Sequence, residues 1–331
     1  MATTSPLAIT ATGIRKSFGD KVVLDTIDLE VAAGQVWSLL GSNGAGKTTM
    51  VHILSTLIRP DAGTVRVAGH DVATDPRAVR RAIGVTGQFA AVDELLTGDE
   101  NLRLMGDLRH LPSRETRRRA AELLERFDLG ADDAKKLAGT YSGGMRRKLD
   151  LMMTLIGRPE IIFLDEPTTG LDPRSRNTMW AIIRALVADG VTIFLTTQYL
   201  DEADQLADRI AVLDGGKLVA QGTPAELKRL VPGGHIRLTF DTDEMCARAA
   251  SALGVSDVDA EGLSLRVPSE GGLPALRHLI DQLSEADITP SGLTVNSPDL
   301  QDVFLTLTSR SPAGDRSAPA AAPENRKEAA R

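Results

Sequence analysis

The feature that most constrains this chain is the glycine-rich segment GSNGAGKT at residues 41–48. It matches the pattern G-x-x-x-x-G-K-[ST] in full. An apolar run that predicts a buried strand, Gln35–Leu40, precedes it, and a helical pattern, Thr49–Leu57, follows it. Strand, glycine loop and helix in this order are the context that a phosphate-binding loop requires.

The residues of this loop have separate expected roles. Glycines let backbone N–H groups turn inward around phosphates, which Cβ atoms would obstruct. Lys47 supplies a mobile positive charge and is a candidate catalytic residue, while the Thr48 hydroxyl is a candidate Mg²⁺ ligand. The predicted nucleotide-binding residues here are Gly41, Ser42, Asn43, Gly44, Ala45, Gly46, Lys47, Thr48 and Thr49.

A second candidate site element is the apolar run IIFL at residues 161–164, which ends in Asp165 and Glu166. If its strand lies beside the phosphate-loop strand, Asp165 would bind Mg²⁺ through water and Glu166 would act as the general base. Such a run is a weak signal alone, because strands often end in acidic turns. Combined with the phosphate loop, it indicates nucleotide hydrolysis.

A third element is Ser142-Gly143-Gly144, which opens a predicted helix, Met145–Leu155. The simplest interpretation is an ordinary helix start capped by serine. The two glycines also leave the first backbone N–H groups bare, which makes a second anion site. In a two-fold dimer, each Ser-Gly-Gly could close on the nucleotide held by the other chain.

The order of strands and helices predicts an α/β fold. Leu7–Ile9, Val22–Val23 and Ile27–Val31 read as strands of an antiparallel layer, with turns at Gly13 and Gly19–Asp20. Buried strands that alternate with helices around the phosphate loop predict a mainly parallel sheet. A helical region is expected over 98–155.

Residues 235–310 are expected to form a second, small α+β domain, because strand and helix patterns alternate there three times. Residues 231–234 are a plausible linker. The Ala/Pro/charge-rich residues 311–331 cannot bury enough apolar surface to order themselves, which predicts a disordered tail. The domain prediction is therefore 7–230, 235–310 and a tail.

Composition excludes several classes of protein. A formal charge of −7 over 331 residues argues against a surface built to bind nucleic acid. No apolar run is long enough for a transmembrane helix, and the start lacks the pattern of a secretory signal. The single cysteine, Cys246, permits no internal disulfide and reads as a small core residue. Arg114–Arg119 and Arg146–Lys148 read as solvated helix faces.

Taken together, these motifs resemble the ATP-binding cassette of ABC transporters over residues 7–230. The phosphate loop, Gln88 after Ile83–Thr86, Tyr141-Ser-Gly-Gly-Met145, Asp165-Glu166 and Gly170-Leu-Asp172 occur in that family's order. The resemblance implies a P-loop ABC ATPase domain that binds ATP and Mg²⁺, with a mainly parallel sheet, an antiparallel layer and a helical subdomain.

The resemblance also implies roles for residues outside the phosphate loop. Phe18 would stack on adenine, although a lone phenylalanine is otherwise usually a core residue. Gln88 would reach Mg²⁺ and the attacking water, and would report the nucleotide state to a membrane partner. Asp172 would lie at the interface of a homodimer.

The sequence departs from the family at the switch position, where Gln198 stands in place of histidine. A glutamine amide can donate a hydrogen bond to the γ-phosphate, but it cannot carry a proton near neutral pH. Hydrolysis is therefore expected to depend on Glu166 as base, with Gln198 as a positioning catalytic residue. Met145 also replaces a common glutamine, which leaves the Ser-Gly-Gly site intact.

Three segments, at residues 165–176, 196–204 and 299–307, resemble the ATPase subunits of daunorubicin/doxorubicin-type antibiotic efflux pumps of actinobacteria. The Gln198 departure is itself typical of that subgroup. The resemblance implies a peripheral ATPase on the cytoplasmic side of the cell membrane, which drives antibiotic export through a separate permease.

Two alternatives stay open at this point. The same type of ATPase can drive export of lipid or polysaccharide, because the ATP-binding cassette does not bind the transported molecule. A soluble ATPase of this superfamily that acts on ribosomes or DNA is the other. Such proteins typically carry two cassettes or a long coiled-coil insertion between Gln88 and Ser142, whereas this acidic chain has one cassette and a short insertion.

Overall fold

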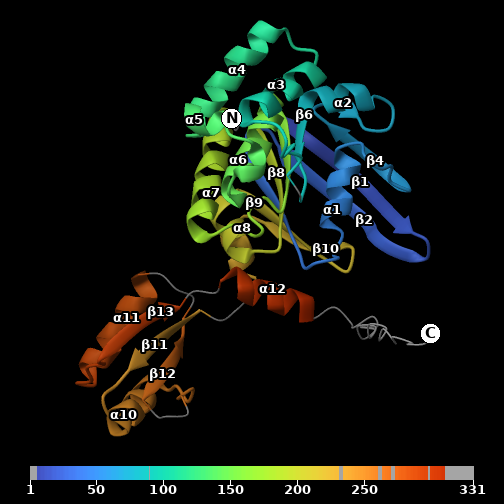
Figure 1. The fold of residues 1–331 in the computed structure, drawn as a ribbon. Coiled ribbons are helices and arrows are strands. Elements are labelled where there is room, and N and C mark those ends of the chain that lie inside the picture. The colour runs from blue at the N-terminus through green and yellow to red at the C-terminus, as the bar shows by residue number, and fades with distance from the viewer. Residues whose placement is uncertain are drawn as a thin grey trace, which may run out of the picture.

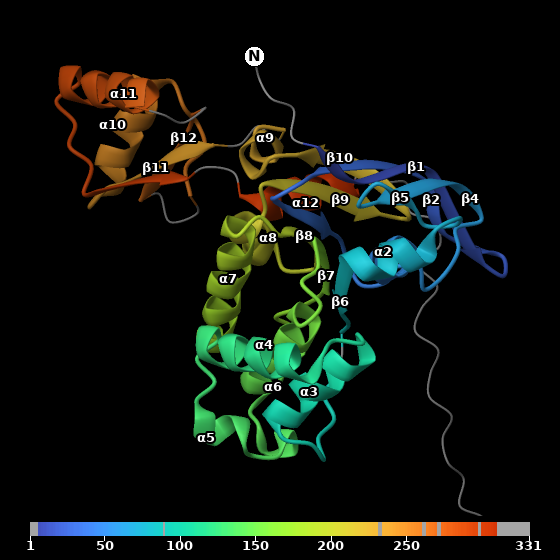
Figure 2. The ribbon, with the colours of Figure 1, turned by 90° about the horizontal axis from the view of Figure 1, so that it is seen from above.

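The computed structural model describes residues 6–88, 90–230, 234–259, 263–269, 273–296 and 299–309. Figures 1 and 2 show the chain from two sides. We call residues 7–230 the N-terminal region and residues 235–309 the C-terminal region. The predicted tail lies outside the described residues, as do residues 231–233 of the predicted linker. No helix in the described ranges is both long and apolar enough to span a bilayer.

The N-terminal region is built around a six-stranded sheet with the order β10-β9-β3-β8-β7-β6. Its strands are β3 (Val36–Leu40), β6 (Ile83–Thr86), β7 (Ile161–Asp165), β8 (Thr192–Thr197), β9 (Arg209–Asp214) and β10 (Lys217–Gly222). All neighbours pair in parallel except β9 and β10. The central strands β3, β7 and β8 are buried throughout, which is why they read as continuous apolar runs. The predicted, mainly parallel sheet is confirmed.

A second sheet, with the order β2-β1-β4-β5, forms the antiparallel layer. It consists of β1 (Leu7–Phe18), β2 (Lys21–Ala32), β4 (Ala62–Val67) and β5 (His70–Asp71). The turn predicted at Gly13 is wrong: β1 continues through this residue with a shift of register. Gly13 has a φ of +63°, so it forms a bulge that glycine adopts without strain. Side chains of both sheets share one hydrophobic core with helix α1 (Lys47–Leu54).

The predicted helical region is confirmed as a group of helices on one side of the parallel sheet (Figure 2). It contains α3 (Gly98–Leu108), α4 (Ser113–Arg126), α5 (Ala131–Ala134), a 3₁₀ turn (Ala138–Thr140) and α6 (Gly143–Leu155). The remaining helices of the N-terminal region are α2 (Pro76–Ala82), α7 (Pro173–Ala188), α8 (Leu200–Leu206) and α9 (Pro224–Lys228). Apolar faces of α6 and α7 form a second core with β7 and β8.

The C-terminal region contains an antiparallel sheet with the order β12-β11-β13. Its elements are β11 (His235–Thr239), α10 (Asp243–Leu253), β12 (Ser264–Pro268), α11 (Leu273–Glu285), β13 (Gly292–Asn296) and α12 (Leu300–Ser309). Alternate residues of β11, Ile236 and Leu238, are buried against α10 and α11. Cys246 lies in this core, as predicted, and burial raises the pKa of its thiol.

Helix α12 differs from the other elements of the C-terminal region because it packs on the N-terminal region. Leu300 and Val303 are buried in a cluster with Ala203 of α8 and Leu227 of α9. The sequence pattern groups this helix with residues 235–310, whereas its contacts tie it to the other region (Figure 1). The domain boundaries themselves stay a prediction.

Candidate nucleotide-binding site

The phosphate loop runs from the end of β3 to the start of α1 and borders a pocket of about 320 Å³. The loop fits only glycine at two positions. A Cβ on Gly41 would lie 2.5 Å from the carbonyl oxygen of Leu213. Gly46, the N-cap of α1, has a φ of +110°, and a Cβ there would lie 2.9 Å from the Val23 carbonyl oxygen. The pocket is lined by Val23, Asn43, Gly44, Gly46, Lys47, Thr48, Thr49, Gln88 and Glu166.

Lys47 and Glu166 form a buried ion pair at the floor of this pocket. The Lys47 Nζ lies 3.2 Å from Glu166 Oε1, and the two side chains are only 4% and 7% exposed. The same ammonium donates to the carbonyl oxygens of Gly41 and Ser42, at 3.0 and 3.1 Å. Burial of both charges is sustained because they are paired and hydrogen-bonded. The loop and the end of β7 therefore meet, although β8 lies between β3 and β7 in the sheet, so the assumption that the two strands are direct neighbours is wrong.

Oxygen ligands suited to a divalent cation gather beside this pair. The Thr48 hydroxyl donates to Asp165 Oδ2 at 2.9 Å, and the Thr196 hydroxyl donates to Asp165 Oδ1 at 2.5 Å. Gln88, which carries a side-chain amide, lines the same pocket. Hydroxyl, carboxylate and amide oxygens are the ligand types that Mg²⁺ prefers. The residues present therefore fit the cation that the sequence predicts.

Gln198 lies next to the candidate base. Its Nε2 donates to Glu166 Oε2 at 3.4 Å, and the Thr169 hydroxyl donates to the same oxygen at 3.3 Å. Glu166 has a φ of +50°, a conformation that non-glycine residues adopt mainly where the surroundings impose it. Its backbone N–H donates to the Thr196 carbonyl oxygen at 3.0 Å. Thr196 of β8 thus holds the backbone of Glu166, and Gln198, just after β8, and Thr169 hold its side chain.

Ser142, Gly143 and Gly144 lie at the start of α6, outside the lining of the phosphate pocket. Ser142 Oγ caps the helix by accepting the Met145 N–H at 3.2 Å, and both Ser142 and Gly143 are exposed. Gly144 is required by close packing, because a Cβ there would lie 2.6 Å from Ser175 Oγ. Asp172 caps the neighbouring helix α7, and the bonds from Ser175 lower the pKa of this carboxyl.

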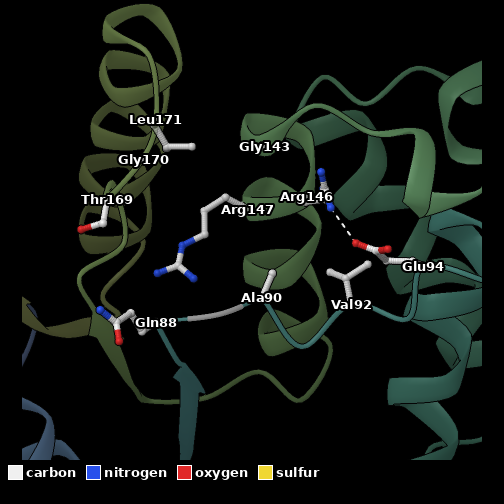
Figure 3. Close-up of a pocket in the computed structure, with 10 residues that line it drawn as sticks. All are labelled: Gln88, Ala90, Val92, Glu94, Gly143, Arg146, Arg147, Thr169, Gly170 and Leu171. Carbon is white, nitrogen blue, oxygen red and sulfur yellow. Dashed lines mark hydrogen bonds and ion pairs between the residues drawn. The ribbon is translucent and has the colours of Figure 1, made fainter. Parts of the chain in front are cut away.

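A second pocket, also of about 320 Å³, separates this helix start from Gln88 (Figure 3). Gly143, Arg147 and Gly170 line it together with Gln88, which therefore borders both pockets.

Phe18, the predicted adenine-stacking residue, also lies outside the lining of the phosphate pocket. It ends β1 and is 53% exposed, and Lys16 Nζ lies 5.4 Å from the centroid of its ring. Its exposure excludes the alternative of a core residue. The pocket wall beside the phosphate loop is instead formed by Val23 of β2.

Sequence reasoning missed several residues that shape the site. Thr196 anchors Asp165, and Glu202 on α8 is fully buried, where it accepts hydrogen bonds from Thr168 and Trp180. Arg147 is only 8% exposed, so the interpretation of Arg146–Lys148 as a solvated face is wrong for its middle residue. A threonine at a strand end and an arginine in a basic run carry no sequence signal of burial, because the groups they contact are far apart in the chain.

This fold and pocket define a P-loop nucleotide-binding protein whose lysine, hydroxyl and carboxylate groups surround a phosphate site. Residues 24–169 match the ABC transporter family. The chain is 50% identical over 303 residues to the daunorubicin resistance ATP-binding protein DrrA3 of Streptomyces coeruleorubidus, covering 91% of this chain and 96% of that protein. It is 48% identical over 334 residues to the daunorubicin/doxorubicin resistance ATP-binding protein DrrA of Streptomyces peucetius, covering 98% and 99%.

Among solved structures, a dimeric ATP-binding cassette in a post-hydrolysis state with ADP and phosphate superposes with a TM-score of 0.60. It is 25% identical and covers 65% of this chain and 98% of that one. The chain belongs to the family of ABC transporter ATP-binding subunits. It is an ABC-type ATPase, and cassettes of this family form dimers and work with membrane permeases.

Proposed function

We propose that this chain powers efflux of an anthracycline-like antibiotic through a separate membrane permease, on whose cytoplasmic side it binds. The buried Lys47–Glu166 pair beside the Thr48–Asp165 contact is the observation that carries the ATPase part of this mechanism. The similarity to resistance proteins over nearly the whole chain supports the cargo part.

ATP phosphates would enter the pocket along the loop, where Lys47 and the backbone N–H groups from Gly44 to Thr49 can hold them. Phosphate oxygens would then compete with Glu166 for Lys47, which frees the carboxylate. The adenine would extend beyond Val23 toward the exposed face of Phe18, where stacking tolerates any purine.

Thr48, Asp165 and Gln88 would hold Mg²⁺, which neutralises phosphate charge when it is bound. Glu166, once released by Lys47, can accept a proton from a water placed for attack on the γ-phosphate. Gln198 reaches the same carboxylate and can orient that water by donating a hydrogen bond. It cannot take up a proton near neutral pH, so Glu166 is the sole base of this arrangement.

The start of α6 would complete the site of a second copy. Ser142, Gly143 and Gly144 are too far from the phosphate pocket of their own chain to line it, and they present bare N–H groups at a helix N-terminus. In a two-fold dimer they would contact the ATP of the partner. ATP then favours the closed dimer and hydrolysis reopens it, which supplies work to the permease.

A drug-efflux assay tests the identity of the transported molecule. Cells that express the chain with its permease should retain less anthracycline than cells with the Lys47→Ala variant, in a panel that also contains unrelated antibiotics. Equal retention with both chains, while purified wild-type protein hydrolyses ATP, would overturn the cargo proposal and leave the ATPase standing. Export of labelled lipid or polysaccharide by the same cells would establish the alternative cargo. Binding to ribosomes in place of a permease would establish the third function.

A further inference from the structure

Helix α6 carries a buried ion pair that the ATP chemistry above does not use. Arg147 and Asp150 are 8% and 3% exposed, and Arg147 Nη1 lies 3.5 Å from Asp150 Oδ2. Burial lowers the pKa of Arg147 and raises the pKa of Asp150. A buried pair of this kind costs free energy of desolvation, which a pair of apolar residues would avoid. The other contacts of Arg147 and Asp150 therefore indicate what this costly ion pair does.

The guanidinium of Arg147 holds the end of the strand that carries the catalytic carboxylates. Its Nε donates to the Pro167 carbonyl at 2.9 Å, and its Nη2 donates to the carbonyls of Asp165 and Glu166 at 3.2 and 3.3 Å. Three successive carbonyls around Glu166, itself in a left-handed conformation, thus share one partner. The backbone that aims Glu166 at Lys47 is fixed from α6.

The same ion pair also holds the segment that carries Gln88. Arg147 Nη1 donates to the Gly87 carbonyl at 2.7 Å, just before Gln88. Asp150 Oδ1 accepts the backbone N–H of Ala91 at 3.0 Å, three residues after it. Figure 3 shows Arg147 reaching from α6 toward Gln88 and the segment that contains Thr169. The backbone before and after Gln88 is therefore held from α6, at Gly87 and at Ala91.

Only arginine can make this set of contacts. Its guanidinium has five N–H donors in a fixed plane, and here four carbonyl oxygens and one carboxylate oxygen accept them. A lysine in its place would keep the charge but has three donors at a single point. The Arg147→Lys substitution therefore separates the geometry of the contacts from their charge.

We propose that Arg147 and Asp150 are positioning residues, which tie the Ser142–Gly144 end of α6 to Gln88 and Glu166. Arg147 lies only three residues after Gly144 on one continuous helix. A shift of this helix when its N-terminus engages a phosphate moves the carbonyl anchors of Gln88 and Glu166 with it. Through this ion pair, the position of the Glu166 carboxylate depends on the position of helix α6.

The test is steady-state ATP hydrolysis by the full chain, with kcat and KM measured separately. In Arg147→Lys we expect kcat to fall about tenfold, while KM for ATP and the melting temperature stay close to wild type. Asp150→Asn is the second variant: it keeps an acceptor for the Ala91 N–H and loses the charge that holds Arg147. The matched control is Arg118→Lys, in an exposed ion pair with Glu122, which should leave both constants unchanged.

A double-mutant cycle with Gln88→Ala distinguishes positioning from general support of the fold. If Arg147 acts partly by positioning Gln88, Arg147→Lys should lower kcat clearly less in the Gln88→Ala background than in wild type. An equal fold loss in both backgrounds overturns the proposal, as does an unchanged kcat in Arg147→Lys. Unfolding of both Arg147→Lys and Asp150→Asn also overturns it, because the pair would then be structural.

Discussion

The N-terminal and C-terminal regions differ most in whether charged side chains are buried in their interiors. The buried charged side chains among the described residues are Lys47, Arg147, Asp150, Asp165, Glu166 and Glu202. All of them belong to the N-terminal region. The described part of the C-terminal region buries Ile236, Leu238, Cys246 and similar side chains, and no charged one. Among the described residues, one region buries no charged side chain, and the other accepts the free-energy cost of burying several.

That cost is concentrated in one place. Lys47, Asp165 and Glu166 line or border the phosphate pocket, Arg147 holds the carbonyls behind it, and Glu202 bonds to Thr168 two residues after Glu166. Buried charge in this chain therefore marks the site and its supports. Substitutions of these groups should change catalysis or its pH dependence, whereas core substitutions in the C-terminal region should change stability.

Among the substitutions that test this comparison, the one at Glu166 should have the largest effect, a loss of turnover. Glu166→Gln removes the base and keeps the shape of the side chain, so kcat should fall by about 100-fold or more while ATP still binds. The variant should accumulate as a nucleotide-bound dimer in size-exclusion chromatography. Glu160→Gln, an exposed glutamate just before the same strand, is the matched control. Normal phosphate release by Glu166→Gln would remove Glu166 as the base.

A second prediction concerns which of the two regions helix α12 stabilises. Leu300→Ala removes a 3% exposed side chain from the cluster with α8 and α9, and should lower the stability of the N-terminal region by about 2–4 kcal/mol. Both tryptophans of the chain, Trp37 and Trp180, lie in that region, so their fluorescence during urea unfolding follows it alone.

The control for α12 is Leu305→Ala on the same helix, where the side chain is 57% exposed and little should change. Leu279→Ala, in the core of the C-terminal region, should leave the tryptophan transition in place. A tryptophan transition that Leu300→Ala does not shift would show that α12 contributes nothing to the N-terminal region.

Local pattern predicted the elements that depend on a short stretch of sequence. The phosphate loop between Val36–Leu40 and α1 is such a case, because its glycines, lysine and flanking periodicity all lie within about 20 residues. The strand before Asp165 and the cap at Ser142 follow for the same reason. The antiparallel layer was predicted in kind, but the first predicted strand ended at Ile9, before Gly13, and β2 was divided into two short strands.

What the sequence left open depends on contacts between distant segments. Arg147 stands in a basic run, and only the packing of α6 against the ends of β6 and β7 buries it. Helix α12 follows β13 in the chain, yet its apolar face fits a surface formed by α8 and α9. Neither outcome is encoded in the local spacing of residues, since the partners lie tens of residues away.

A smaller effect is expected at the switch position. Gln198→Ala removes the hydrogen bond to Glu166 and should lower kcat about tenfold with little change in KM, the size expected for one bond to a charged group. Gln205→Ala, an exposed glutamine on α8, should have no effect. A wild-type kcat in Gln198→Ala would place all of the positioning of Glu166 on Thr169, Lys47 and Arg147.

The smallest effect concerns the buried carboxyl of Glu202. Burial raises its pKa, so the folded chain binds this proton more readily than the unfolded chain does. Wild-type stability should therefore fall as pH rises from the ordinary glutamate pKa through the raised one, and then level off. Glutamine keeps an oxygen for Thr168 and Trp180 but cannot titrate.

Between pH 5 and pH 8, the melting temperature of wild type should consequently fall relative to that of Glu202→Gln. Each unit by which the pKa is raised corresponds to about 1.4 kcal/mol, or a few degrees for a region of this size. Glu160→Gln, whose carboxyl is exposed, should keep a constant difference across this range. A constant difference for Glu202→Gln as well would mean that Glu202 carries the same charge in the folded and unfolded chain. The burial of Glu202 would then carry no electrostatic cost, which contradicts the comparison for this residue.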